Sequence, residues 1–249
     1  YRKICKKKIP INEMNFINAE IAKIALNTYI TTKISFANSI LRICHNNKSA
    51  DVDVITNSIG NDPRIGKKYL KGGISYGGPC FPRDNLALKA YVKKLKQVNN
   101  LPAAVHQSNI MHSHFITNTI SKLTKKEGAI SLLGLSYKED TDVTDESFSI
   151  KILELLAKKN FKLLVYDTNI EDIKSITNKI DYFKFFSDFN KMINKTDTLV
   201  LTSNQKNYLD LIYRYKSERK IKILDCWRSI DEKKLNNNFQ IIYLGKNLY

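Results

Sequence analysis

Glycine and proline are scarce in this chain and unevenly distributed. Its 249 residues include only 9 Gly and 5 Pro. Neither occurs between residues 12 and 47, so the residues that most often end a helix are missing there. Six of the nine Gly lie between residues 60 and 78. The stretch GGISYGGPCFPRD, residues 72–84, contains four Gly and two Pro around a single Cys. This clustering predicts a loop with an unusual backbone path.

Long apolar runs are also missing. No run of about 18 apolar residues occurs, so no membrane partner is expected. The first residues, YRKICKKKIP, are basic but lack the apolar core of a signal peptide and have no Met. This start suggests that the sequence begins inside a longer protein. The four Cys lie far apart without a CxxC pair, so we expect no metal site and a reduced, cytoplasmic setting.

Acidic residues are few relative to basic ones. The chain has 41 Lys and Arg against 24 Asp and Glu, a formal net charge of +17. Such a charge favours anionic ligands, including phosphates and nucleic acids. The lysines are scattered, however, and no arginine-rich arm or basic block is present. We therefore expect a phosphate-bearing small substrate and no nucleic-acid partner.

The hydrophobic pattern changes character along the chain. Up to residue 123, helical spacing of apolar residues predicts one long helix, or two with a break, followed by shorter helices. After residue 128, short apolar runs such as KLLVYD and IKILDCW alternate with helical stretches, which predicts a doubly wound, mostly parallel sheet. The expected fold is α/β, with a helical domain at 13–123 and a Rossmann-like domain at 124–249. Side chains at the carboxyl ends of the strands can bind ligands, and the candidates are Lys138, Asp167, Ser203 and Arg228.

The stretch at residues 72–84 also contains chemically reactive groups. Pro79 and Pro82 stiffen the chain on both sides of Cys80, and Arg83 lies close by, just before a predicted helix. A thiol in such a setting can act as a nucleophile toward a carbonyl, although an inert buried Cys fits the composition as well. Asp84 can cap the helix or activate water, and both interpretations stay open.

Three long motifs resemble one known family. The segment NDPRIGKKYLKGGISYGGPCFPRDNLAL is similar to the active-site segment of the UDP-glucose/GDP-mannose dehydrogenases. AEIAKIALNTYITTKISFANSI resembles the central helix of that family, and LLGLSYKEDTDVTDES resembles the start of its C-terminal nucleotide-binding domain. The order and spacing agree over essentially the whole chain. The resemblance implies a cytoplasmic homodimer, formed through the central helix, which oxidises C6 of a nucleotide sugar to a carboxylate with NAD.

The resemblance also implies four catalytic residues. Cys80 corresponds to the nucleophile that forms a thiohemiacetal and then a thioester. Lys23 and Asn27, one helical turn apart, correspond to the pair that faces the reacting oxygen. Asp84 corresponds to the Asp that assists water or proton transfer. Without the resemblance, the simpler interpretation of Lys23 and Asn27 would be a solvated Lys and a polar Asn on the surface of the helix.

Substrate and cofactor contacts follow from the same motifs. Arg83 corresponds to a basic residue near the cofactor. Arg228 is predicted to contact the sugar, although many relatives have that Arg where Trp227 stands here. Close approach of the loop to sugar and phosphate would explain its glycines. The other residues implied to bind substrate are Arg64, Tyr69, Leu70, Lys71, Gly72, Gly73, Gly77 and Lys138.

The chain departs from the family pattern in two ways. No GxGxxG follows a strand, so residues 1–12 are expected to be the tail of an N-terminal NAD-binding domain that the sequence lacks. The family Arg near the NAD pyrophosphate falls on Asp145. We therefore expect part of a longer dehydrogenase, inactive alone; the alternative is a non-catalytic nucleotide-sugar-binding or assembly module.

The remaining His and Cys residues are expected to have no chemical role. His112 and His114 stand two residues apart on a helix, which points them in different directions, so surface positions are expected in place of a metal site. Cys44 and Cys226 are expected to be buried core residues.

Overall fold

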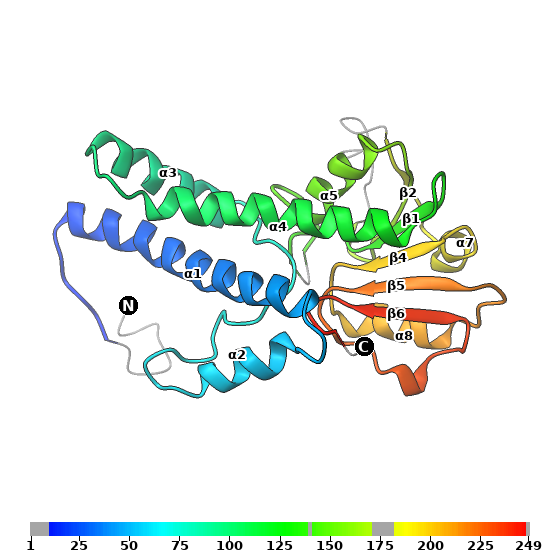
Figure 1. The fold of residues 1–249 in the computed structure, drawn as a ribbon. Coiled ribbons are helices and arrows are strands. Elements are labelled where there is room, and N and C mark those ends of the chain that lie inside the picture. Colours follow the sequence, from blue (N-terminus) through cyan, green and yellow to red (C-terminus); the bar gives the residue numbers. More distant parts are fainter. Residues whose placement is uncertain (1–9, 139–140, 171–181, 248–249) are drawn as a thin grey trace.

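The computed structural model describes residues 10–138, 141–170 and 182–247. A helical module and an α/β module lie side by side (Figure 1). The α/β fold class predicted from the sequence is confirmed. In the part of the chain that is described, no helix combines the length and apolar character needed to cross a membrane. The expected N-terminal tail, residues 1–12, lies mostly outside the described residues.

The helical module is built around α1, Phe16–His45, a single helix of 30 residues. The side chain of Asn15 caps its start by accepting from the backbone N–H of Asn18 at 2.9 Å. Small and polar residues dominate the buried face, which lets neighbouring helices approach closely: Thr28, Thr31, Ser35, Ala37, Asn38, Leu41 and Cys44. The expected burial of Cys44 is confirmed.

Three shorter helices pack around α1. They are α2 (Val52–Gly60), α3 (Phe81–Lys94) and α4 (Leu101–Leu123), and α1 contacts all three. Helix α3 begins at Phe81, directly after Cys80, so the thiol lies just before a helix as the sequence suggested. Pro82 lies in its first turn, where a missing N–H leaves no helical hydrogen bond unmade.

Six parallel strands form the sheet of the second module, in the order β3-β2-β1-β4-β5-β6. Their bounds are Ala129–Leu133 (β1), Lys162–Tyr166 (β2), Lys184–Phe185 (β3), Thr198–Leu201 (β4), Ile221–Asp225 (β5) and Phe239–Tyr243 (β6). The helices within the described residues of this module are α5 (Phe148–Ala157), α7 (Phe189–Ile193), α8 (Lys206–Arg214) and the 3-10 helix η1 (Glu232–Lys234).

Helices cover both faces of this sheet. Alternate strand residues, such as Ile130 and Leu132, pack with α4 and α5 in one apolar cluster. Leu133, Leu199 and their neighbours pack with α7 and α8 in the second cluster. The predicted doubly wound arrangement is therefore present, and α4 belongs to both modules because its C-terminal half covers the sheet (Figure 1).

The residues after β6 join the sheet to the helical module. Lys246 forms an antiparallel bridge with Asp51, and their side chains form an ion pair of 3.1 Å. The backbone N–H of Val52 donates to the carbonyl of Gly245 at 3.0 Å. Gly245 has a φ of +78°, and a Cβ placed there would lie 2.5 Å from Cγ of Leu41. This glycine is needed both for its backbone conformation and for the close approach of the two modules.

Side chains of α1 and α4 hold the glycine-rich loop that follows α2. The backbone N–H of Gly73 donates to Oδ1 of Asn38 at 2.9 Å. Asn109 accepts from the N–H of Tyr76 at 3.0 Å and donates to its carbonyl at 2.9 Å. Backbone groups that could bind solvent or ligand are thus paired with protein, so the loop is held rigidly.

His112 contradicts the surface position expected for it, since its side chain is 0% exposed. Its Nε2 lies 2.7 Å from the carbonyl of Gly73, and its Nδ1 lies 3.2 Å from Nη1 of Arg42. Arg can only donate, so Nδ1 accepts and Nε2 carries the proton. Burial lowers the pKa of His112 to about 4, so the ring is neutral near pH 7. His114, two residues on, is exposed as expected.

We predict that Gly245→Ala lowers the free energy of unfolding by about 2–4 kcal/mol, because the left-handed backbone and the contact with Leu41 both become unfavourable. Gly66→Ala is the matched control. Gly66 has a φ of +71° with no atom within 4 Å of a Cβ, so a loss of about 1 kcal/mol is expected. Urea denaturation measures both, and equal losses would contradict the proposed packing role of Gly245.

A second prediction concerns acid stability. The pKa of His112 is about 4 in the folded protein and 6.5 ordinarily, so only the unfolded chain gains a proton between these values. The buried, neutral His112 therefore costs no stability above pH 6.5. Between pH 6.5 and pH 4 it lowers the free energy of unfolding by about 3 kcal/mol in total. In His112→Gln, which cannot titrate, the free energy of unfolding measured by urea denaturation should not show this decrease between pH 6.5 and pH 4. The exposed control His114→Gln should keep it; an unchanged slope in His112→Gln would refute the assignment.

Candidate functional site

Cys80 stands at the N-cap position of α3, where the glycine-rich loop meets the helix. Its side chain is exposed and makes no capping hydrogen bond, which leaves the thiol accessible. The unpaired N–H groups and the dipole at the start of a helix favour negative charge close by. The exposed thiol is open to an electrophile at this position, and its role as a nucleophile stays a prediction.

Asp84 connects the two helices of the site. Its Oδ2 accepts from Nζ of Lys23 at 2.7 Å and from Nδ2 of Asn27 at 2.6 Å. Its Oδ1 accepts from Nε and Nη2 of Arg83, both at 3.0 Å. Asp84 thus lies within the first turn of α3 and does not cap the helix, because Cys80 occupies that position. Residues more than fifty positions apart in sequence meet here.

Opposing effects act on the charge of Asp84. Burial alone would raise the pKa of this carboxyl, but the hydrogen bonds from Lys23, Asn27 and Arg83 together hold it below its usual value. The pKa of Arg83 is raised, first by its hydrogen bond to Asp84 and to a smaller extent by Cys80. Asp84 is therefore ionised at neutral pH, and the two cations leave one net positive charge beside the thiol.

This arrangement is suited to stabilising an oxyanion next to a thiol. The side chain of Lys23 is 60% exposed, whereas that of Asp84 is only 7% exposed. The carboxylate therefore fixes the position of the ammonium group from the buried side, while the ammonium faces solvent. Lys has three N–H donors and Asn two, so each retains donor capacity beyond its bond to Asp84. Acyl-transfer sites use donors of this kind.

Protein atoms lie close to the glycines of the loop. A Cβ at Gly73 would lie 2.4 Å from the ring of Trp227, and one at Gly77 would lie 2.2 Å from the carbonyl oxygen of Glu146. At Gly72 the nearest atom is Cβ of Leu41 in α1, at 3.0 Å. The missing side chains of these glycines thus let both modules pack closely against the loop. We expected them to admit sugar and phosphate; the observed reason for their small size is contact within the protein.

The remaining residues implied to bind substrate differ in exposure. Tyr69, with a φ of +61°, and Lys71 are exposed, whereas Leu70 is buried. Lys138 is exposed, and its Nζ lies 5.4 Å from the centre of the Tyr137 ring. Arg64, 87% exposed, pairs with Asp62 on the turn after α2. Accessible side chains on both modules thus remain available to a ligand.

Arg228 has an internal role instead of the contact with the sugar that we predicted. Its side chain is 3% exposed. Nε and Nη2 donate to Asp53 in α2, and Nη2 also donates to the carbonyl of Gly72 at 2.6 Å. Nη1 donates to the carbonyls of Cys226 and Leu244. All five donors of the guanidinium are used within the chain, so none is left for a ligand.

Two other strand-end residues are also used by the protein itself. Asp167 accepts from the backbone N–H groups of Leu135 and Ser136, after β1, at 2.6 and 3.1 Å. Asp225 accepts from the N–H groups of Ser229 and Ile230 at 2.7 and 2.8 Å. These carboxylates shape the loops at the carboxyl edge of the sheet. Cys226 is buried as expected, and burial raises the pKa of its thiol.

Several contacts in this region were not predicted from the sequence. Tyr137 and Glu146 pack on the loop beside Cys80, Trp227 packs on Gly73, and Asn38 binds the loop backbone. Trp227 is the single Trp of the chain, and the sequence singled it out only as the residue that stands where many relatives have an Arg. The others are ordinary residue types at unremarkable positions, so nothing local linked them to the loop.

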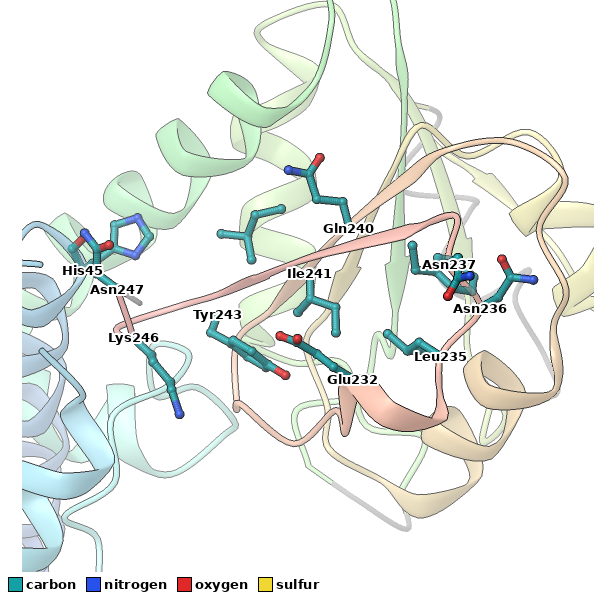
Figure 2. A pocket seen from close by; sticks show the side chains of 12 residues that line it. His45, Glu232, Leu235, Asn236, Asn237, Gln240, Ile241, Tyr243, Lys246 and Asn247 are labelled. Atoms are coloured by element: carbon teal, nitrogen blue, oxygen red, sulfur yellow. The ribbon is translucent and has the colours of Figure 1, made fainter. Parts of the chain in front are cut away.

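A cavity of about 780 Å³ lies elsewhere, along the outer strand β6. Figure 2 shows Gln240 on one side of the strand and Ile241 and Tyr243 on the other, with His45 and Lys246 at one end. None of the predicted catalytic or substrate residues lines it. Its walls lack the thiol, the lysine and the carboxylate described above.

The sheet does not suit NAD in the usual dinucleotide mode, although its strand order matches. The β1–α5 connection has a single glycine, Gly134, and α5 starts only at Phe148, so no helix start follows β1 directly. Asp167, at the end of β2 where such folds hold a ribose, is already paired. Arg83 is the one residue implied to lie near a cofactor. No group of three or more potential metal ligands occurs among the described residues.

Comparison with known proteins gives two family matches. Residues 17–110 match the model described as "UDP-glucose/GDP-mannose dehydrogenase family, central domain". Residues 131–232 match the model described as "UDP-glucose/GDP-mannose dehydrogenase family, UDP binding domain". The two matches follow each other in the order of the helical and α/β modules.

Curated relatives agree with these matches. The chain is 36% identical over 162 residues to UDP-glucose 6-dehydrogenase YwqF of Bacillus subtilis, covering 64% of this chain and 37% of the relative. It is 32% identical over 197 residues to UDP-glucose 6-dehydrogenase TuaD of the same organism, covering 78% of this chain and 42% of the relative. The chain thus spans less than half the length of these relatives.

Solved structures share the fold. A UDP-glucose dehydrogenase from Pyrobaculum islandicum superposes with a TM-score of 0.77 at 23% identity, over 93% of this chain and 51% of that chain. UDP-D-ManNAc dehydrogenase from Pyrococcus horikoshii gives a TM-score of 0.71 at 21% identity, over 94% and 53%. Together with the sequence matches over both modules, these findings place the chain in the UDP-glucose/GDP-mannose dehydrogenase family.

Proposed function

We propose that this chain provides the substrate-binding and covalent part of a nucleotide-sugar 6-dehydrogenase. The observation that carries the proposal is the position of Cys80 at the start of α3, in the same first turn as Asp84, which binds Lys23, Asn27 and Arg83. A thiol, a fixed cation and an amide donor are the groups that acyl chemistry at an aldehyde carbon requires.

In the proposed reaction, Cys80 adds through sulfur to the C6 aldehyde of the sugar and forms a thiohemiacetal. Lys23 and Asn27 donate to the oxygen that becomes negative. Loss of a hydride and a proton from that adduct leaves a thioester, and water then releases the carboxylate and the free thiol. Asp84, ionised and hydrogen-bonded, keeps the ammonium and amide in place and assists proton transfer from water.

The hydride acceptor implied by the family is NAD, which would oxidise the alcohol and then the thiohemiacetal. Since the described sheet does not suit a dinucleotide, Arg83 is the one residue of this chain that we assign to it. Its side chain is 67% exposed beside Asp84 and can attract an anionic group. No step above depends on further contacts with the cofactor.

The proposed substrate is a nucleotide sugar of the UDP-glucose kind. Curated relatives named UDP-glucose 6-dehydrogenase and the UDP binding domain match support the choice. Exposed Lys71 and Lys138, on the two modules, can both approach a diphosphate, and the net charge of +17 favours it. The three described Cys are free thiols, which fits the proposed cytoplasmic location.

One observation favours a non-catalytic binding or assembly module as the second candidate. Asp145, exposed next to Glu146, places a negative charge where the family resemblance implies a positive one near the pyrophosphate of NAD. Like charges repel, so this position would weaken cofactor binding. The four catalytic positions are all retained, however, and we therefore favour the enzyme.

The proposal includes a homodimer formed through α1. Tyr29, Phe36 and Ile43 are spaced by seven residues, and all three are exposed. This spacing places them in one stripe along the helix, on the side opposite to its buried face. Large apolar side chains aligned in this way suit the packing of a second copy against the same stripe.

We predict that Cys80→Ser lowers kcat for acid formation by at least about 10³-fold in the full-length gene product, because a hydroxyl is a much weaker nucleophile and cannot form a thioester. The Kd for UDP-glucose should stay within about threefold, since the two side chains have similar shapes. NADH absorbance and titration calorimetry measure the two quantities.

Full activity of Cys80→Ser would refute the role of the thiol. A wild-type protein that binds UDP-glucose, UDP-N-acetyl sugars or GDP-mannose by calorimetry but forms no NADH with any of them would support the binding module instead. Absence of binding to all of these ligands would contradict both candidates.

The dimer prediction uses Phe36→Glu. A charge in the middle of the stripe would be buried in the dimer without a partner, so the dimer should dissociate. The molar mass measured by size-exclusion chromatography with light scattering should fall from twice 28.7 kDa to 28.7 kDa. Met111→Glu on α4, at an equally exposed apolar position, is the matched control and should remain dimeric. A monomeric wild-type chain would contradict the proposed interface.

A further inference from the structure

The α/β module, which is the C-terminal module of the chain, contacts the loop that carries Cys80. The contacts lie at the last two glycines of that loop, Gly77 and Gly78. Gly78 has a φ of +81°, and a Cβ there would lie 2.4 Å from Cδ2 of Tyr137. The N–H of Gly78 donates to the carbonyl of Glu146 at 3.3 Å, and a Cβ at Gly77 would lie 2.2 Å from the same oxygen. Protein from the connection after β1 thus fills the space beside the residues that precede the thiol.

Cys80 is held on its other side by α3, since its backbone carbonyl accepts from the N–H of Asp84 at 2.9 Å. It is exposed, and its side chain makes no capping hydrogen bond to α3. Further back, the loop is held from the helical module by Asn38, His112 and Asn109. At Gly77 and Gly78, the loop contacts Tyr137 and Glu146 of the connection after β1, and the backbone of Phe148 lies close to Gly77. The backbone of the two residues Gly77 and Gly78, shortly before the thiol, is therefore in direct contact with the C-terminal module.

Within the C-terminal module, Tyr137 contacts two further residues, Val143 and Lys138. Its N–H donates to the carbonyl of Val143 at 3.0 Å, which closes the connection after β1. The Nζ of Lys138 lies 5.4 Å from the centre of its ring, within the range of cation–π attraction. The ring thus contacts both the loop that bears Cys80 and the lysine proposed to bind the nucleotide sugar.

We propose that Tyr137 is a positioning residue for Cys80, whose ring transmits nucleotide binding at Lys138 to the backbone of residues 77–80. The inference rests on the proposed function, because that function places the nucleotide at Lys138 and the reaction at Cys80. A ligand that fixes Lys138 also fixes the adjacent ring, and the ring lies against Gly78. The nucleotide portion of the substrate would then order the thiol before the sugar reaches it.

Amide hydrogen exchange of the peptide spanning residues 72–80 tests the contact directly in the ligand-free chain. Tyr137→Ala should accelerate exchange there at least tenfold, because the ring no longer supports Gly78. Tyr137→Phe keeps the ring and should change it less than threefold. Tyr213 is the matched control: it lies in the same module with the Nζ of Lys234 5.6 Å from its ring centre, so Tyr213→Ala should leave residues 72–80 unchanged.

A second measurement uses UDP, which lacks the sugar and cannot cover the thiol in the way that the sugar would. Saturating UDP should slow exchange of residues 72–80 at least threefold in the wild type and in Tyr137→Phe, but not in Tyr137→Ala. Calorimetry should show UDP bound by all three variants with Kd values within fivefold. A structural defect alone would not abolish a ligand response while binding persists.

The outcomes separate this inference from the proposed function. Equal exchange in Tyr137→Ala and wild type without ligand overturns the positioning role, and so does UDP protection that persists in Tyr137→Ala. In either case UDP binding by the wild type leaves the proposed function standing. Failure of the wild type to bind UDP contradicts the UDP-sugar assignment and overturns the transmission from Lys138 with it.

Discussion

The burial of one guanidinium, that of Arg228, holds the two modules together. It lies at the turn after β5 with a φ of +56° and is 3% exposed. Burying a charge is strongly unfavourable unless it is paired, and here Asp53 and three backbone carbonyls pair it completely. Those acceptors come from α2, from Gly72 and from the ends of β5 and β6. The geometry of the glycine-rich loop therefore depends on the same contact that joins the sheet to the helices.

The reactive site is built on this frame by a second buried charge. Asp84 is the common acceptor for Lys23, Asn27 and Arg83, so a single carboxylate sets the positions of three donors at the first turn of α3, the helix that Cys80 precedes. Because the pairs lie at the junction of α1 and α3, their geometry depends on how these two helices pack. The small, polar residues on the buried face of α1 permit that close packing.

Much of this organisation was predictable from local patterns. The strands follow from short apolar runs that end in turn residues, and the long helix follows from the absence of Gly and Pro over residues 12–47. Cys80, Lys23, Asn27 and Asp84 were identified from motifs whose spacing resembles a known family, and the structure brings Lys23, Asn27 and Asp84 into contact. The fold class is confirmed because neighbouring residues contain the information that sets strands and helices, whereas the catalytic roles of the four residues stay predictions.

The sequence by itself determined the α/β fold class, most of the strands and helices, and the place of Cys80 just before a helix, since each depends on short-range preferences of the chain. Only the tertiary structure decided that Arg228 binds protein instead of sugar, that His112 is buried, and that Tyr137 packs on Gly78. Such outcomes depend on which distant groups meet and on which of them lose contact with water. An arginine or histidine looks alike in sequence in either case, because its environment is created only when the two modules pack.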